Sequence, residues 1–368
     1  MPQNIFSYYR RMRSEGPVSF NRDSGAWDVF DYADVHFILM HNEIFSSDPS
    51  YSGRMADGRM GPGASFITMD NPDHKDLRNI SAPFFLPSSI EKYSEHIEKI
   101  SSDLISKLEP GQDFISGYAV GLPVNVISDL LGVPESEREM FKAWSDYIIG
   151  NRRDDGFDKI NRYMYAKTSE IFLHKDSDDI MSVINRGLFH STPLTVEQKI
   201  GYVMLLIIGG NETTTNLLGN MVRALSENPG IQELVREDKG YYRNFIEETL
   251  RYYSPIQFLP HRFAAQDYVL NGKQIRKGDR ISIWLGSANR DEGQFDNPEE
   301  FMIDRRKNNH LAFGMGVHMC LGAPLARLEA EIGLKDILEK FPRINVNREK
   351  SKMLDNPMVY GFSELYMD

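Results

Sequence analysis

The sequence predicts a mainly α-helical fold with a small β-sheet region. Apolar residues three and four positions apart, the period of a helix with one buried face, recur in residues 88–108, 134–149, 157–172, 177–188, 241–252 and 323–341. A further helical segment, 195–228, is longer than any of these. Strand patterns are short and occur near 17–30 and 268–285. We therefore expect a single domain, residues 1–368, in which this small sheet packs on a large helical part.

Both strand regions predict hairpins. In the first, residues 17–20 and 27–30 flank a Gly/Asp-rich turn at 21–25. In the second, Asn271-Gly272 favours a tight turn between antiparallel strands, because both residue types tolerate positive φ. A further short strand is expected at 281–285.

Residues 195–228 predict one helix that crosses the whole molecule. Thr195 and Gln198 form a capping box at its start, and Pro229 ends it. A helix of this extent is roughly 45–50 Å long. Residues 202–208 are apolar on every face, so we expect protein to surround this part of the helix.

A chemically unusual turn follows the apolar part of this helix. Gly209, Gly210, Glu212 and Thr213 place two residues without side chains, an acid and an alcohol at the centre of a buried rod, and such violations tend to mark functional sites. Glycine lets a flat or small ligand approach the backbone, and the Thr213 hydroxyl can bond the Gly209 carbonyl, open the helix locally and admit water. A packing contact at the glycines is the alternative.

Cys320, the only cysteine, lies in a glycine-containing loop directly before a predicted helix that begins near Pro324. The positive end of that helix and its free N–H groups favour a thiolate, so we expect a lowered thiol pKa and a metal-binding sulfur. Gly314, Gly316 and Gly322 would let the loop fold around the sulfur. The alternatives are a buried cysteine that acts as a small hydrophobe, and a nucleophile assisted by His318.

Composition excludes several functional classes. The formal charge of -11, from 42 basic and 53 acidic residues, argues against nucleic acid as a partner. The first residues lack the apolar core of a secretory signal, and residues 202–208 form too short an apolar run to span a bilayer, so we expect no membrane anchor and a cytoplasmic protein. A single cysteine excludes an internal disulfide.

Together these motifs resemble the cytochrome P450 family of haem-thiolate monooxygenases. Phe313, Gly314, Gly316, His318, Cys320 and Gly322 are similar to the haem-binding loop of that family, and residues 209–214 resemble its oxygen-activating turn. Glu248-x-x-Arg251 resembles its Glu-x-x-Arg helix, and Arg305 would complete its Glu-Arg-Arg triad. The resemblance implies the cytochrome P450 fold, with the long central helix crossing over a haem b whose proximal iron ligand is Cys320.

The resemblance also implies roles for individual residues. Thr213 and Glu212 would be catalytic and would organise proton delivery to bound O2. Gly209, Phe313 and Gly316 would line the haem. His74, Arg78, Arg262 and His318 would bind the haem propionates, and the arginines suit carboxylates best. The triad Glu248, Arg251 and Arg305 would be structural.

The implied reaction inserts one oxygen atom of O2 into a small, largely apolar substrate. No dinucleotide-binding motif is present, so two electrons would come from a ferredoxin-like donor with its reductase, which could dock on Arg305, Arg306 and Lys307. Phe258 and Leu259 would contact substrate or merely pack against the sheet. Further candidate substrate contacts lie in 47–67, 147–188, 256–259 and 358–362. The alternatives are a peroxide-dependent peroxygenase or haem-thiolate isomerase, or a non-catalytic haem-based gas sensor or carrier; Glu212 with Thr213 argues against the peroxygenase and the isomerase.

Overall fold

The computed structural model describes residues 5–52, 66–133 and 179–368, together with Ser136, Arg138, Arg162 and Ala166. The helices predicted at 134–149 and 157–172 lie outside these residues, apart from isolated positions. The α-helices of the described part, in chain order, are α1 (Ile5–Glu15), α2 (Tyr32–Met40), α3 (Asp73–Ser81), α4 (Pro87–Ile90), α5 (Ser94–Lys107), α6 (Gly121–Leu130), α9 (Ile180–Asn185), α10 (Val196–Glu227), α11 (Pro229–Glu237), α12 (Tyr242–Tyr252), α13 (Leu285–Ala288) and α14 (Ala323–Lys340).

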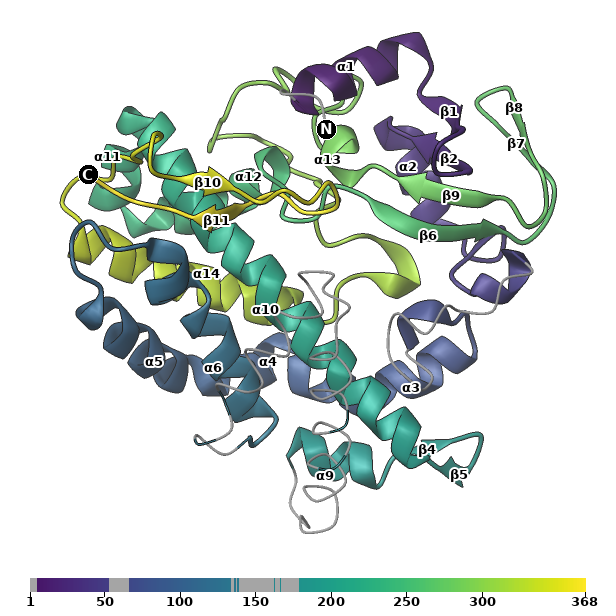
Figure 1. The fold of residues 1–368 in the computed structure, drawn as a ribbon, viewed down its shortest axis with the longest axis horizontal. Helices are drawn as coiled ribbons and strands as arrows, with labels where there is room; N and C mark the ends of the chain where they lie inside the picture. The colour runs from purple at the N-terminus through teal and green to yellow at the C-terminus, as the bar shows by residue number, and fades with distance from the viewer. Residues whose placement is uncertain are drawn as a thin grey trace.

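Helix α10 runs diagonally across the molecule (Figure 1). The predicted capping box is confirmed, because the Thr195 hydroxyl accepts the Gln198 N–H and the Gln198 side chain accepts the Thr195 N–H. At about 1.5 Å per residue, its 32 residues span about 48 Å. It packs against α6 and α14 along its length. Protein surrounds Tyr202, Val203 and Met204, as their apolar character predicts.

A five-stranded sheet lies on the other side of the molecule from α5 and α6 (Figure 1). Its order is β1-β2-β9-β6-β3, in which β2 and β9 are parallel and the other neighbours are antiparallel. The strands of this sheet are β1 (Val18–Asn21), β2 (Ala26–Val29), β3 (Phe45–Ser46), β6 (Leu259–Ala264) and β9 (Arg280–Ile283).

Both predicted hairpins are confirmed. Strands β1 and β2 join through a turn in which Gly25 has a φ of 65°. Strands β7 (Tyr268–Leu270) and β8 (Lys273–Ile275) join through Asn271 and Gly272, with φ values of 47° and 71°. This second hairpin is a separate ribbon rather than part of the larger sheet. Two further ribbons are formed by β4 (Leu188–Phe189) with β5 (Thr192–Pro193), and by β10 (Lys352–Met353) with β11 (Phe362–Glu364).

Some predicted boundaries were wrong. The helix expected at 88–108 is divided into α4, a 3₁₀ turn at Glu91–Tyr93 and α5. The strand expected at 281–285 ends at Ile283, and α13 begins two residues later. Within 177–188, only Ile180–Asn185 is α-helical among the described residues.

Separate apolar cores hold the helices and the sheet. The larger core lies among α5, α6, α10, α12 and α14. A second core lies beneath the sheet and includes Val29, Ile281 and Ile283. The segment that leads into α14 passes between the sheet and α3 (Figure 1), so it lies where the two parts meet. Within the described residues, no helix is both long enough and apolar enough to cross a membrane.

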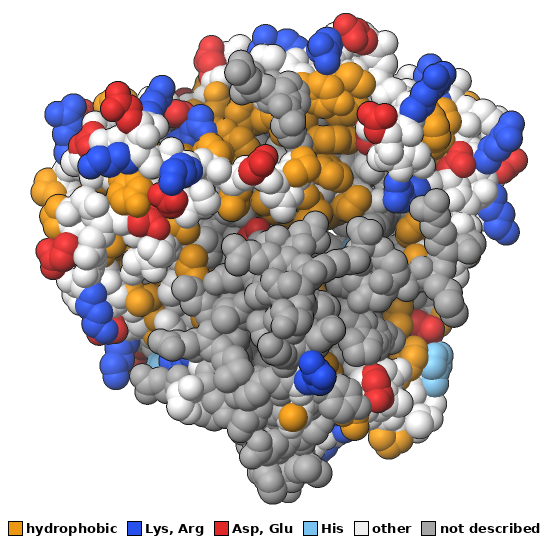
Figure 2. All heavy atoms as spheres, viewed as in Figure 1, with side chains coloured by type: hydrophobic (Ala, Val, Ile, Leu, Met, Phe, Trp, Pro, Cys, Tyr) orange, Lys and Arg blue, Asp and Glu red, His pale blue; other side chains and the backbone are white. Residues whose placement is uncertain are grey.

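Charged side chains of both signs are interspersed over the face shown in Figure 2, and apolar side chains gather near α1 and the loop between β10 and β11. Met358 of that loop is 36% exposed. Met358 begins the segment 358–362, which is one of the candidate substrate contacts.

Candidate functional site

The loop that carries Cys320 folds back on itself directly before α14. Gly314 and Gly316 have φ values of 67° and 70°, which only glycine adopts without strain. The Cys320 N–H donates to the Phe313 carbonyl at 2.8 Å and closes the loop. The φ of the third glycine, Gly322, is −82°, so its role is to cap α14 rather than to turn the chain.

The loop lies against α2 through Gly316. A Cβ atom at this position would lie 2.5 Å from the carbonyl oxygen of Leu39, well inside van der Waals contact. Only a residue without a side chain therefore fits between the loop and α2. This contact fixes the loop four residues before the sulfur.

The expected lowering of the Cys320 pKa is wrong for the protein alone. Burial raises the pKa of the thiol, and this outweighs the opposing hydrogen bonds from the N–H groups of Gly322 and Ala323 and the charges of Arg78 and Arg327. The predicted N–H donors are present, but desolvation is larger. A metal bound to the sulfur would reverse the balance, because a coordinating thiol is deprotonated outright.

Four basic side chains predicted from separate segments lie together beside this loop. His74 and Arg78 share one face of α3, and the His74 and His318 rings have centroids 4.1 Å apart. Arg262 of β6 is close enough to both histidines to lower their pKa values. Arg78 Nη2 donates to the carbonyl of Met319 at 2.6 Å. His74 is 2% exposed, which excludes a solvated surface face for it.

Burial determines the charge of this cluster. Burial and then Arg78 lower the pKa of His74 to about 4, and burial and then Arg262 lower the pKa of His318 to about 2. Both imidazoles are therefore neutral at pH 7. Burial lowers the pKa of Arg262 to about 10 and also lowers that of Arg78, but both guanidiniums remain charged at pH 7. The cluster thus carries the charge of its arginines alone.

The turn around Gly209 has the hydrogen bond that the sequence predicts. Thr213 Oγ1 donates to the Gly209 carbonyl at 2.9 Å. The residues from 209 to 213 nevertheless remain α-helical, so the bond is made without the expected opening of the helix. Gly209 is exposed, whereas the residues on either side of it in α10 are half-buried or buried, and nothing lies within 4 Å of the position a Cβ would take. Open space therefore borders the middle of this helix.

These residues fit a haem bound through its iron and two propionates. The space beside Gly209 admits a flat group, and the backbone N–H groups of Gly322 and Ala323 favour the thiolate form of Cys320. Both ring nitrogens of His74 are buried and have no hydrogen-bond partner among the described residues. Buried polar atoms normally have partners, so a ligand oxygen would complete their hydrogen bonding.

The predicted Glu-Arg-Arg triad is present on the side of α12. Arg251 donates to both oxygens of Glu248 at 2.8 and 2.7 Å, and Arg305 Nε donates to them at 3.0 and 3.1 Å. Glu248 and Arg251 are fully buried. The remaining guanidinium N–H groups reach backbone carbonyls such as that of Glu300, so both guanidiniums are hydrogen-bonded beyond their shared carboxylate.

Several other expectations need correction. Arg305 cannot belong to a docking patch, because only 6% of its side chain is exposed and it is committed to Glu248; Arg306 and Lys307 are exposed. Phe258 stacks on Trp284 with ring centroids 4.5 Å apart, and Leu259 belongs to β6, so the structure favours packing for both. Most of the candidate substrate segments 47–67 and 147–188 lie outside the described residues.

The sequence did not predict a second cluster near the cysteine loop. Glu247 contacts both His310 and Arg327, and the Arg327 guanidinium lies 4.5 Å from the centre of the Phe313 ring. Ser47 Oγ lies 3.0 Å from His318 Nε2 and was considered only as part of a substrate loop. These contacts join segments that are distant in the sequence, so residue spacing does not predict them. The one indication in the sequence was the position of Glu247 directly before the predicted triad residue Glu248.

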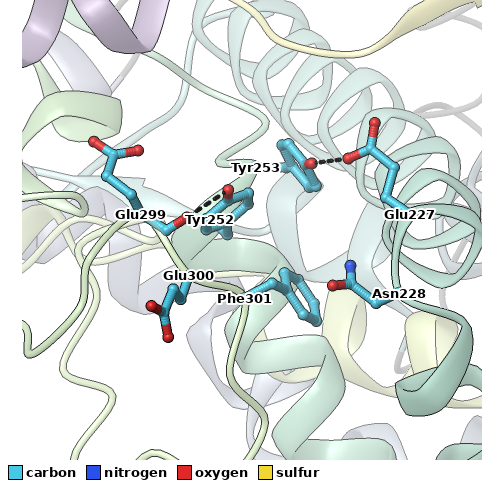
Figure 3. Close-up of a pocket in the computed structure, with 7 residues that line it drawn as sticks. All are labelled: Glu227, Asn228, Tyr252, Tyr253, Glu299, Glu300 and Phe301. Atoms are coloured by element: carbon cyan, nitrogen blue, oxygen red, sulfur yellow. Dashed lines mark hydrogen bonds between the residues drawn. The ribbon is translucent and has the colours of Figure 1, made fainter.

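A surface cavity of about 450 Å³ lies at the C-terminal ends of α10 and α12 (Figure 3). Its lining contains none of the predicted site residues. Tyr253 donates to the Glu227 carboxylate, and Tyr252 donates to the carbonyl of Glu299 at 2.9 Å. Arg223 and Arg290 also pair with the carboxylates of Glu227 and Glu299. The lining residues are Glu227, Asn228, Tyr252, Tyr253, Glu299, Glu300 and Phe301.

Known proteins resemble this chain over almost its whole length. A sequence model described as Cytochrome P450 matches residues 124–364. Cytochrome P450 109 from Bacillus spizizenii is 36% identical over 377 residues, which cover 98% of this chain and 90% of that protein. A crystal structure of a cytochrome P450 from the thermoacidophilic archaeon Picrophilus torridus with bound 4-phenylimidazole is 53% identical, has a TM-score of 0.88, and covers 96% of this chain and 99% of that chain. CYP109E1 from Bacillus megaterium in complex with testosterone is 36% identical, with a TM-score of 0.89 and 98% coverage of both chains.

Proposed function

Because the chain belongs to the cytochrome P450 family, it is a haem-thiolate monooxygenase that binds haem b, and we propose that Cys320 is the proximal iron ligand. The closed loop around Cys320, with N–H groups directed at its sulfur, is the observation that carries this proposal. We further propose that residues 1–368 act as one domain. When bound, the haem supplies O2 binding, electron storage and transfer of an oxygen atom.

The basic cluster beside the loop would bind the propionates. Arg78 and Arg262 provide two positive charges for two carboxylates, while neutral His74 and His318 provide hydrogen bonds without further charge. A guanidinium also matches the planar geometry of a carboxylate. Gly209 would face the haem from the distal side, and Phe313 and Gly316 from the proximal side.

Thr213 and Glu212 would deliver protons on the distal side. Since the Thr213 hydroxyl donates a hydrogen bond to the Gly209 carbonyl, its oxygen remains able to accept a hydrogen bond from a water molecule. A water held there is positioned to pass a proton onward, and Glu212, on the same turn, would supply protons to that water.

Replacement of Thr213 tests this role. Thr213→Ala is expected to consume NADH and O2 in a reconstituted ferredoxin system while yielding several-fold less product per NADH, because proton delivery to the distal oxygen becomes uncontrolled. Thr213→Ser should restore most of the coupling. Thr215→Ala is the matched control, because the Thr215 hydroxyl donates to the Ala119 carbonyl instead. Full coupling in Thr213→Ala would exclude the proposed role.

The substrate that we propose is small and largely apolar. The Picrophilus torridus relative binds 4-phenylimidazole and CYP109E1 binds testosterone, and both ligands are mostly hydrocarbon. The apolar area near α1 and the loop between β10 and β11 is consistent with entry of such molecules (Figure 2). Absorbance titration of the haem protein with 4-phenylimidazole and testosterone tests the class, and no spectral change with either would count against it.

Electrons would come from a ferredoxin-like protein and its reductase. Arg306 and Lys307 are exposed on the segment that follows the Glu248 triad and provide positive charge for an acidic partner. Arg306→Glu is expected to slow reduction at low salt and to flatten the dependence on ionic strength. Reduction rates and salt dependence equal to those of the wild type would remove this patch from the docking surface.

A further inference from the structure

Glu247 connects two elements that flank the cysteine loop. It lies on α12, and its carboxylate accepts Nε and Nη2 of Arg327, on α14, at 2.6 and 2.9 Å. The same carboxylate lies 3.0 Å from Nε2 of His310, which precedes the loop. Only 3% of the His310 side chain and 19% of the Glu247 side chain are exposed. His310 and Glu247 are therefore largely shielded from water.

The backbone fixes the protonation pattern of His310. Its Nδ1 accepts the N–H of Ala312 at 3.2 Å, so this nitrogen carries no proton. A neutral ring then has its proton on Nε2, which donates to Glu247. Glu247 consequently accepts one hydrogen bond from His310 and two from Arg327. The two parallel N–H···O bonds fix the position of the Arg327 guanidinium against this carboxylate.

In that position the guanidinium lies over the ring of Phe313, whose carbonyl closes the cysteine loop. The Arg327 guanidinium is 4.5 Å from the centre of the Phe313 ring, and the Phe313 carbonyl accepts the Cys320 N–H at 2.8 Å. A cation held in place therefore lies near the cysteine loop, close enough for its charge to favour the thiolate form of Cys320. It has no part in the Glu248 triad, and the sequence motifs give it no role.

We propose that Glu247 and His310 are positioning residues that hold Arg327 over Phe313, where its charge favours the one-electron reduction of the cysteine-bound iron. The inference rests on the proposed ligation by Cys320. When the ferredoxin-like donor transfers one electron to the iron, the site gains one negative charge, and a nearby cation stabilises that state. No bond forms or breaks in this step. Because 36% of the Arg327 side chain is exposed, solvent weakens the effect without removing it.

Potentiometric titration of the haem protein tests the proposal. Arg327→Gln should lower the equilibrium constant for one-electron reduction several-fold. A tenfold decrease in this constant corresponds to a shift of about 59 mV toward negative potential. Arg327→Lys, which keeps the charge but loses the fork, should recover most of the loss. Glu247→Gln keeps one oxygen that accepts a hydrogen bond from Arg327 and so leaves Arg327 in place, but it removes a negative charge and should shift the potential in the opposite direction. If these residues had a merely structural role, the reduction potentials of Arg327→Gln and Glu247→Gln would shift in the same direction.

Lys340→Gln is the matched control, because it removes a cation from the same helix about 20 Å farther along α14. Its potential should equal that of the wild type. An unchanged potential in Arg327→Gln, or shifts of the same sign in Arg327→Gln and Glu247→Gln, would overturn the proposal. Should Arg327→Gln fail to bind haem, Glu247→Gln decides alone, and an unchanged or more negative potential overturns it. The spectrum of the reduced protein with carbon monoxide reports thiolate ligation separately, so failure of the proposed function is distinguishable.

Discussion

Replacement of Gly316 by alanine is expected to destabilise the protein by about 2–5 kcal/mol. A left-handed conformation, here with a φ of 70°, costs an L-residue about 1–2 kcal/mol. The new Cβ would also lie 2.5 Å from the Leu39 carbonyl oxygen, which belongs to the backbone of α2 and cannot rotate away. Overpacking of this kind costs about 1–3 kcal/mol. The loop must therefore move away from α2 and carry Cys320 with it.

Gly25→Ala separates the two contributions. Gly25 has a φ of 65°, but nothing lies within 4 Å of a Cβ at that position. The stability of Gly25→Ala should therefore fall only by the cost of the left-handed conformation, about 1–2 kcal/mol. Guanidinium unfolding of the haem protein, followed by circular dichroism, gives both free energies, and the haem absorbance spectrum should change in Gly316→Ala alone. Equal losses of stability and unchanged spectra in both variants would refute the contact between the loop and α2.

Three further changes test the buried charges. Glu248→Gln leaves the Arg251 guanidinium without its buried counter-charge and should cost about 3–5 kcal/mol in chemical unfolding; a loss below about 1 kcal/mol would contradict the pairing. Burial and then the Asp34 charge raise the pKa of Asp31 to about 7, so between about pH 4 and 7 the folded state holds a proton that the unfolded state lacks, and stability falls as pH rises. The free energy of unfolding of Asp31→Asn, relative to that of the wild type, should therefore rise by about 1–2 kcal/mol from pH 4 to pH 8, because the partial exposure of Asp31 weakens the effect. A difference in free energy that stays constant with pH would exclude this titration. Arg262→Gln should release haem several-fold faster to an excess of apomyoglobin, and an unchanged release rate would remove Arg262 from the propionate site.

Local chemistry in the sequence predicted the fold where it is decisive. The capping box at Thr195 located the start of α10 to the residue, and Asn271-Gly272 located the turn between β7 and β8. Strand β6 was missed, because Pro260 interrupts its strand pattern and cannot donate to a neighbouring strand. The pairing register with β9 shifts between Leu259 and Arg262, and this irregularity accommodates the proline.

The candidate site was predictable where its residues share one motif. His74 and Arg78 are four residues apart on one helix, and Thr213 reaches the Gly209 carbonyl over the same interval. The pKa of Cys320 was not predictable, because desolvation depends on residues packed from other elements. The same reason explains why Arg327 gave no signal, since its position depends on Glu247, a residue remote in sequence.

The absorbance spectrum of the reduced protein with carbon monoxide tests thiolate ligation most directly. The wild-type protein should show the signature of thiolate-bound haem, and Cys320→Ser should lose it even where haem is retained. A Cys320→Ser protein with the same signature as the wild type would contradict the assignment of Cys320 as the iron ligand.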